Sequence, residues 1–379
     1  MIYLDNAATS FPKAPGVAEA MARALAGAGG NPGRASHRLA LEGSRIQFRT
    51  REALAALLGV RDAGRVCFTK NATEALNLAI LGRVPPGGAV ALGALQHNAV
   101  MRPLRHLEAA RGVRLLTVPQ DACGRHDPEA LRAALAARPD LMVLNAACNV
   151  TGALAAVGEI AARCRAAGVP LCLDVSQWVG HLPLAVADLD PALVCGSGHK
   201  GLLGPGGTGF CCVPEGCEPQ PLLRGGTGSA SESECQPEFL PDRYEAGTAN
   251  LPGLAGLLAA LEWLEATGLE TVRRREAART EQLARGLAAL PGVTVLGPGP
   301  GAERAPVVAV TVAGRDLGEL ALELDRRDIA TRVGLHCAPA VHRVLGTLQG
   351  GGALRFAPGA FTTAAEVDAA LAAMEDLLA

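Results

Sequence analysis

Helix-like and strand-like stretches alternate along this chain from about residue 43 onward. Short apolar runs rich in Val, Leu and Ala are typical of buried strands, and the stretches between them carry apolar residues at helical spacing. Strands separated by helices indicate a parallel sheet with helices on both faces. The predicted strands are 65–69, 89–92, 113–118, 141–146, 170–174, 192–195 and 209–213, and the predicted helices are 44–58, 73–81, 100–111, 128–137 and 157–167.

The pattern changes after Asn250, where two long helices are predicted before a Gly/Pro-rich connection at 291–306. The chain's 379 residues exceed one average domain. We therefore expect a large domain at 13–252 and a smaller α/β domain formed by 1–12 and 253–379. The predicted elements of this second part are helices at 254–264, 269–290, 317–326 and 364–378 and strands at 307–312, 330–332 and 353–357.

Charge and cysteine usage exclude several classes of function. The net charge is −2, with 35 basic and 37 acidic residues, so we expect no nucleic-acid partner and no anionic membrane. No secretion signal or membrane-spanning run is evident, which predicts a soluble, cytoplasmic protein. The eleven cysteines lack metal-ligand spacing. Most lie in apolar segments and are expected to be core residues, for example Cys67, Cys148, Cys172 and Cys195.

One lysine, Lys200, lies in a glycine-rich turn between the strands predicted at 192–195 and 209–213. Most lysines are solvated surface residues. Here Ser197 and His199 can both reach an anion, and the glycines permit close backbone approach. A lysine whose pKa is lowered by burial can form a Schiff base with an aldehyde, so Lys200 is a candidate catalytic residue.

Other polar residues follow the predicted parallel strands, where ligands of such sheets bind. Thr73 lies at a strand-to-helix turn, and it either helps to hold a phosphate or simply caps the helix with Glu74 in the first turn. Asp174 ends a buried strand and needs a partner, for which a pyridinium N–H is suitable. His97 either stacks on an aromatic ring or is a loop histidine. Lys200 follows Asp174 by 26 residues, and this order joins the signals into one candidate site.

The sequence resembles the aminotransferase class V group of pyridoxal phosphate (PLP) enzymes and, within it, the cysteine desulfurases, with group II the most similar. The resemblance implies the fold type I PLP transferase architecture, similar to aspartate aminotransferase, and a homodimer. Two departures are Gln96, where many members carry Glu, and Ala249, where Pro is common. The segments that carry the resemblance are Tyr3–Thr9, Asn71–Glu74, Gln96–Asn98, Asn149–Gly152, Asp174–Gln177, Ser197–Lys200, Tyr244–Thr248 and Arg332–Cys337.

The resemblance assigns a role to each matching residue. Lys200 would hold PLP covalently and later move the substrate Cα proton. Asp174 would pair with the pyridine nitrogen, His97 would stack on the ring, and Gln177 would bind the phenolic oxygen. The expected phosphate-binding residues are Ala72, Thr73, Ser197 and His199, with Thr248 reaching the partner subunit's cofactor. The expected ligands of the substrate α-carboxylate are Asn149, Arg332 and Arg355.

Cys337 decides which reaction the resemblance implies. Because most of the other cysteines are expected to be core residues, the default expectation for Cys337 is the same. Gly334, His336 and Pro339 instead favour a loop, where functional residues often lie. In group II desulfurases the nucleophile follows the carboxylate-binding arginine at the spacing seen between Arg332 and Cys337. The implied reaction converts L-cysteine to L-alanine and leaves a Cys337 persulfide for a sulfur-acceptor protein, in iron-sulfur cluster assembly or for another sulfur product. Either His336 or the substrate's own thiol chemistry would assist deprotonation.

Several alternatives stay open at this point. A selenocysteine lyase or another PLP-dependent C–S lyase would share Lys200, Asp174 and both arginines, whereas a transaminase would not need Cys337. A non-catalytic sulfur carrier or scaffold predicts damage at Lys200 or Asp174, and both residues are present. A cysteine-rich metal-binding protein would need ligand spacing that this chain lacks. The sequence assigns no role to the segment 225–242.

Overall fold

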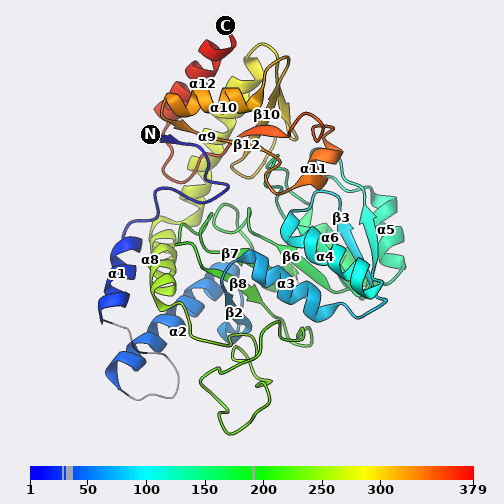
Figure 1. Ribbon diagram of the computed structural model, residues 1–379, viewed down its shortest axis with the longest axis vertical. Helices are drawn as coiled ribbons and strands as arrows, with labels where there is room; N and C mark the ends of the chain where they lie inside the picture. Colours follow the sequence, from blue (N-terminus) through cyan, green and yellow to red (C-terminus); the bar gives the residue numbers. More distant parts are fainter. Residues whose placement is uncertain (28–29, 31–36, 190–192) are drawn as a thin grey trace.

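A seven-stranded sheet forms the centre of the larger part of the molecule (Figure 1). The computed structural model describes residues 1–27, 30, 37–189 and 193–379. The strand order is β2-β8-β7-β6-β5-β3-β4. β8 runs antiparallel to β2 and β7, and all other neighbouring strands are parallel. This confirms the predicted, mostly parallel sheet. Its strands are β2 (Val66–Thr69), β3 (Ala89–Gly93), β4 (Arg114–Val118), β5 (Leu141–Asn145), β6 (Leu171–Asp174), β7 (Leu193–Ser197) and β8 (Gly209–Cys212).

Helices cover both faces of this sheet. Successive strand residues point to opposite sides, so apolar side chains on each face are buried under helices. Leu171 and Leu173 of β6 pack into one core and Cys172 packs into the other. Both faces are therefore apolar, which explains the nearly continuous apolar runs in the sequence. The first core includes α2 (Arg38–Leu58), α5 (Pro128–Ala136), α6 (Val157–Ala167), α7 (Val186–Leu189) and α8 (Leu251–Thr267), and the second includes α3 (Ala72–Arg83) and α4 (Asn98–Arg111).

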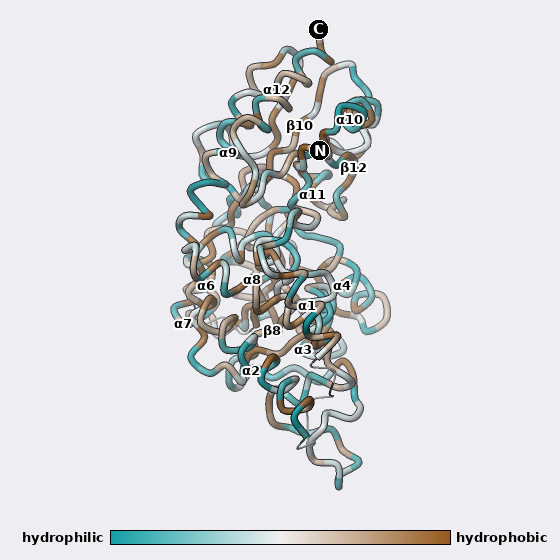
Figure 2. Tube along the Cα trace, turned by 90° about the vertical axis from the view of Figure 1, so that its left-hand side faces the viewer, coloured by the Kyte–Doolittle hydropathy of each residue, from teal (hydrophilic) through white to brown (hydrophobic). Residues whose placement is uncertain are grey.

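A smaller antiparallel sheet lies with three helices at the top of Figure 1. Its strand order is β12-β13-β10-β9. The start of the chain joins this unit, because β1 (Ile2–Tyr3) pairs in parallel with β11 (Ile329–Ala330). Hydrophobic residues run along β10 and around β8, whereas hydrophilic residues lie along outer turns of α10 (Figure 2). The elements are β9 (Val293–Leu296), β10 (Val308–Val312), β12 (Arg332–Gly334), β13 (Ala353–Phe356), α9 (Leu269–Ala289), α10 (Leu317–Arg326) and α12 (Ala364–Leu378).

Some elements differ from the expectation. The helix α1 (Val17–Gly27) was not predicted, β9 lies inside the stretch expected to be a connection, and the short helix α11 (Pro339–Val344) begins two residues after Cys337. The division into two domains stays a prediction, although Ala255 of α8 packs with Ala20 and Ala24 of α1 in the larger unit. We therefore propose a boundary near Gly268. Within the described ranges no helix is both long enough and apolar enough to cross a membrane.

Candidate active site

The strand ends of the large sheet enclose a cavity of about 190 Å³ that contains Lys200. Nine predicted site residues line it, although they come from segments far apart in the sequence. They are Ala72, Thr73, His97, Asn149, Asp174, Gln177, Ser197, His199 and Lys200. Further lining residues that sequence reasoning did not single out are Asn71, Leu76, Ala99, Asn145 and Ser176.

Lys200 is held in place by close packing of two backbone turns. A Cβ atom at Gly201 would lie 2.3 Å from the carbonyl oxygen of Val179, and one at Gly180 would lie 2.2 Å from the carbonyl carbon of Gly201. Burial lowers the pKa of Lys200 to about 8, although the Asp174 carboxylate opposes this shift. About a tenth of the amine is therefore neutral, and thus nucleophilic, at pH 7, and about half is neutral at pH 8.

Asp174 ends β6 and is almost fully buried. Its Oδ1 accepts hydrogen bonds from Ser176 N at 3.0 Å and Ser176 Oγ at 2.6 Å. No hydrogen bond from the described residues reaches Oδ2, which leaves an acceptor on a buried carboxylate for a ligand N–H. Ser176 is an orienting residue that its spacing of two from Asp174 would have indicated.

His97 and Gln177 are oriented by hydrogen bonds to the backbone. His97 Nδ1 accepts from Ala99 N at 3.0 Å and caps α4, so its proton lies on Nε2. Burial lowers the pKa of His97, which keeps the ring neutral. Gln177 Nε2 donates to the carbonyl oxygen of Ala7 at 2.8 Å. The amide plane of Gln177 is thereby fixed against the N-terminal segment.

Two features of the cavity suit a phosphate group. The first turn of α3 carries Ala72 and Thr73, whose backbone N–H groups have no hydrogen-bond partner among the described residues. The N-cap of α3 is Asn71, whose Oδ1 accepts from Glu74 N at 2.9 Å, so the reading of Thr73 as the N-cap is wrong. Ser197 Oγ is buried and also has no partner in the described part of the chain. Together with Lys200 and Asp174, these groups fit PLP.

His199 is fixed by the N-terminal segment. Its Nδ1 lies 3.0 Å from Thr9 Oγ1, and its carbonyl oxygen accepts from Ser10 N at 2.9 Å and Lys13 Nζ at 3.2 Å. Burial, with Lys200 and Lys13 nearby, lowers the pKa of His199 to about 4. Thr9 and Lys13 were missed as supporting residues, because nothing in their local sequence indicates a contact 190 residues away.

The two predicted carboxylate-binding arginines are bridged by a residue that the sequence did not single out, Asp5. Arg332 Nη2 donates to Asp5 Oδ2 at 2.8 Å, and Arg355 Nη2 donates to Asp5 Oδ1 at 2.9 Å. Arg355 also donates to the carbonyl oxygen of Asn149 at 2.9 Å, and its Nε is buried without a partner among the residues that the structure describes. Neither arginine lines the Lys200 cavity.

Cys337 is exposed on a loop that three hydrogen bonds hold. Asn149 Nδ2 donates to the carbonyl oxygen of His336 at 2.7 Å, Asn98 N donates to that of Cys337 at 2.8 Å, and His336 Nε2 lies 3.1 Å from Ala353 O. The φ angles of His336 and Cys337 are 49° and 56°, in the left-handed region that costs a non-glycine residue about 1–2 kcal/mol. The surrounding bonds offset that cost.

Cys337 lines a second cavity of about 430 Å³, which shares Thr73, His97 and Ala99 with the Lys200 cavity. Burial lowers the pKa of His336 to about 3, so its imidazole is a weak base. Of the two routes for deprotonation, the burial of His336 therefore disfavours the one that uses its imidazole. Thr248 is exposed and lines neither cavity.

The other cysteines mostly behave as expected. Cys67, Cys148, Cys172 and Cys195 are buried, and burial raises the pKa of the Cys67 and Cys195 thiols. The residues that the structure describes contain no group of three or more His, Cys, Asp or Glu side chains that could hold a metal ion.

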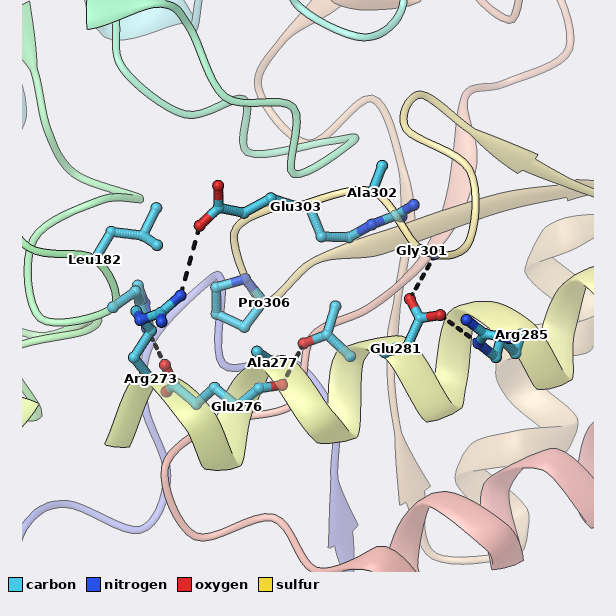
Figure 3. A pocket seen from close by; sticks show the side chains of 13 residues that line it. Leu182, Arg273, Glu276, Ala277, Glu281, Arg285, Gly301, Ala302, Glu303 and Pro306 are labelled. Carbon is cyan, nitrogen blue, oxygen red and sulfur yellow. Dashed lines mark hydrogen bonds and ion pairs between the residues drawn. The ribbon is translucent and has the colours of Figure 1, made fainter. Parts of the chain in front are cut away.

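A further cavity, of about 500 Å³, lies elsewhere, beside α9 (Figure 3). No predicted site residue lines it. Its acidic side chains already have partners: Glu276 lies 2.8 Å from His181 Nδ1, and Glu281 accepts from Gly301 N at 2.9 Å. The His181 ring packs against Gly201, since a Cβ there would lie 2.8 Å from its Nε2. His181 and Glu276 thus support the turn that carries Lys200 from the side of α9.

Comparisons with known proteins agree with this geometry. The family model for aminotransferase class V matches residues 2–370. A probable cysteine desulfurase of Aeropyrum pernix is 33% identical over 90% of this chain and 86% of its own. A cysteine desulfurase of Pectobacterium atrosepticum is 29% identical over 90% of this chain and 84% of its own.

Two solved structures share the fold. The cysteine desulfurase of Thermococcus onnurineus has a TM-score of 0.93 at 29% identity and covers 100% of this chain and 94% of its own. An Escherichia coli cysteine desulfurase has a TM-score of 0.89 at 26% identity, covering 100% of this chain and 95% of its own. The chain therefore belongs to the aminotransferase class V family, and within this family it is similar to cysteine desulfurases.

Proposed function

We propose that this protein is a PLP-dependent cysteine desulfurase, which converts L-cysteine to L-alanine and transfers the sulfur to Cys337 as a persulfide. The single observation that carries the proposal is the position of Cys337. Only two of the eleven cysteines are exposed, and of these Cys337 alone borders the cavity that adjoins Lys200. Exposure is what a nucleophilic thiol needs, and the buried thiols lack it.

The residues of the Lys200 cavity would hold PLP, and one of them would accept the Cα proton of the substrate. When bound, PLP supplies an electron sink conjugated to the substrate amine. Lys200 is the group that takes the proton from the substrate Cα, since its lowered pKa leaves a neutral amine available near pH 8. Asp174 would offer its buried carboxylate to the pyridine nitrogen, and the neutral His97 ring would stack on the cofactor.

The substrate carboxylate would bind at the two arginines that Asp5 bridges. Two guanidinium groups and one carboxylate leave one positive charge, which suits a single carboxylate. Asn149 links this pair to the Cys337 loop, because its backbone accepts from Arg355 and its side chain donates to His336 O. Cys337 Sγ would then attack the substrate sulfur as a thiolate, so that a sulfur–sulfur bond forms and the Cβ–S bond of the substrate breaks. The electron pair of the broken bond stays on the carbon skeleton of the substrate, which takes up protons at Cβ and Cα and leaves as alanine.

The test is alanine formation from L-cysteine by the PLP-loaded protein in the presence of a reductant. Wild type should form alanine, and Cys337→Ala should form almost none. The matched control is Cys235→Ala, which removes the other exposed cysteine and lines neither cavity. Cys235→Ala should retain wild-type activity.

Other results would assign the protein differently. Equal release of sulfide and pyruvate by wild type and Cys337→Ala would indicate a C–S lyase. A strong preference for selenocysteine, again without dependence on Cys337, would indicate a selenocysteine lyase. Conversion of PLP to its aminated form with a keto acid would indicate a transaminase.

We further propose that the enzyme is a homodimer, that Thr248 reaches the partner subunit's cofactor, and that a sulfur-acceptor protein removes the persulfide. Thr248 is exposed and lines neither cavity of its own subunit, which supports a role at the partner subunit's site. A cytoplasmic location is consistent with eleven free cysteines, which reducing compartments preserve. Sedimentation of the holoenzyme would test the dimer directly.

A further inference from the structure

The cavity that contains Cys337 is lined by one arginine and by no acidic residue. We call it the Cys337 pocket, and it is formed by α3, α4 and the Cys337 loop. Thr73, Asn77 and Leu81 line it from α3, and Arg102 and His106 line it from α4, one turn apart. Its volume of about 430 Å³ exceeds that of the Lys200 cavity, so a second small molecule or a side chain of a partner protein has room beside Cys337.

Arg102 carries an uncompensated charge at this pocket. No Asp or Glu is among the residues that line it. Arg102 is exposed, and no ion pair or hydrogen bond joins its side chain to any described residue. Arg105, three residues later on the same helix, is by contrast paired with Glu108 at 2.6 Å. The positive charge of Arg102 contributes to the lowered pKa of His97, so its field extends to the residues of the pocket.

We propose that the Cys337 pocket is the docking site of the sulfur acceptor and that Arg102 selects an acceptor thiol flanked by a negative charge. This inference rests on the proposed function, because it requires a Cys337 persulfide. The occupant is argued from charge complementarity: a thiolate is anionic, and a neighbouring carboxylate or sulfonate adds to its attraction for Arg102. Leu81, Ala99 and Pro103 supply apolar contacts for the carbon chain of such a thiol.

The transfer step balances without an external oxidant. The acceptor thiol first loses its proton to solvent. Its thiolate attacks the outer sulfur of the Cys337 persulfide, a new sulfur–sulfur bond forms, and the bond between that sulfur and Cys337 Sγ breaks. The electron pair of the broken bond stays on Cys337 Sγ as a thiolate, and the acceptor leaves as a persulfide.

The experiment uses three small thiols of different charge on the holoenzyme. The protein is loaded with one equivalent of L-cysteine, the alanine formed is quantified, and loss of the extra sulfur atom on Cys337 is followed by mass spectrometry. The thiols are 2-mercaptoethanesulfonate (anionic), 2-mercaptoethanol (neutral) and cysteamine (cationic). Each rate is divided by the rate of the same thiol with a small neutral disulfide, which removes differences in intrinsic nucleophilicity.

At low ionic strength we expect the anionic thiol to react about tenfold faster than the cationic thiol after this normalisation. The difference should shrink at about 0.3 M salt, because the Arg102 charge is screened. Arg102→Gln should abolish most of the preference, and Arg102→Glu should reverse it in favour of cysteamine. The matched control Arg105→Gln, on the same helix but outside the pocket, should retain the wild-type order.

Two outcomes overturn the inference in distinguishable ways. If L-cysteine yields no alanine and no persulfide, the proposed function fails and this inference fails with it. If the persulfide forms but is consumed without regard to thiol charge, or if Arg102→Gln keeps the wild-type order, only the role of Arg102 and its pocket is wrong.

Discussion

The pKa of Lys200 makes a direct prediction at the scale of one residue. Burial lowers it to about 8 from the ordinary lysine value of about 10.4. Only the neutral amine attacks an aldehyde, so the rate at which the apoprotein captures PLP should rise about tenfold per pH unit below about pH 8 and then level off. Stopped-flow absorbance of the Lys200–PLP bond measures this rate.

A free lysine side chain measured in parallel supplies the reference for PLP's own ionisation. Its rate should keep rising towards pH 10, and the two profiles should therefore diverge above pH 8. A capture rate that climbs with the reference all the way to pH 10 would show that Lys200 is solvated in the apoprotein.

A second prediction at the scale of one residue concerns Asp5. It is almost fully buried, and it holds Arg332 and Arg355 through four hydrogen bonds of 2.8–3.2 Å. Asp5→Asn keeps the shape but removes the counter-charge, so the half-exposed Arg332 should swing away from the buried Arg355. We expect kcat/KM for L-cysteine to fall about tenfold or more, mainly through KM.

Steady-state kinetics with L-cysteine check the Asp5 prediction. Asp316→Asn serves as control, because Asn caps the exposed start of α10 about as well as Asp does. A lower KM in Asp5→Asn would mean the opposite of our expectation, namely that Asp5 competes with the substrate carboxylate for the arginines.

At the scale of elements, α2 makes two ion pairs with other segments, and these pairs differ in burial. Arg51 pairs with Glu245 at 2.6 Å, and their side chains are 7% and 13% exposed. Arg49 pairs with Glu262, also at 2.6 Å, but these side chains are 63% and 48% exposed. Glu245 additionally accepts from the backbone of β2 through Phe68 N at 2.7 Å. The buried pair thus joins α2, β2 and the segment that leads to Thr248.

Glu245→Ala should lower the free energy of unfolding by about 3–5 kcal/mol, because it leaves the Arg51 charge buried without a counter-charge, with the carbonyl oxygen of Val66 as its hydrogen-bond acceptor. Glu262→Ala should lower it by about 1 kcal/mol or less, since water solvates Arg49. Denaturant titration of both variants measures the contrast. Losses of equal size would indicate that burial does not set the contribution of these pairs.

The elements also show what local sequence determines. The strands and helices of the large sheet follow from apolar periodicity, because each buries a continuous face. The strand β9 is hidden in the sequence, since Val293–Leu296 is short and stands between Pro291-Gly292 and Gly297-Pro298. The helix α11 begins at a proline that also suits a loop. Short elements are fixed by tertiary pairing rather than by their own pattern.

For the whole molecule, the candidate site depends on contacts between distant parts of the chain. The position of Lys200 and Asp174 at adjacent strand ends was predictable, because parallel strands bring their carboxyl ends together. The Asp5 bridge was not, because it requires β1 to pair with β11 across more than 300 residues. Likewise, the contacts that fix His199 depend on how the N-terminal segment crosses the large unit.

Gly152 makes one such long-range contact, between the Asn149 turn and the stretch that leads into β10. Gly152 O accepts from Ala305 N at 2.9 Å. A Cβ at Gly152 would lie 2.7 Å from Val307 O and 2.8 Å from Ala305 O, both backbone atoms. Since Asn149 contacts both Arg355 and His336, a shift of this turn should move the substrate-binding arginine and the Cys337 loop together.

Gly152→Ala should therefore lower both stability and activity. Gly346→Ala serves as the control that separates the effect of backbone strain from the effect of moving the turn. The φ angle is +71° at both glycines, so the two substitutions carry the same left-handed strain of about 1 kcal/mol. A Cβ at Gly346 meets nothing within 4 Å. Gly346→Ala should cost only that strain and keep kcat/KM, whereas Gly152→Ala should cost more and reduce kcat/KM about tenfold or more, because the turn must move. Denaturant titration and cysteine kinetics on both variants decide this, and equal effects would show that the contact between the two parts of the molecule does not position the site.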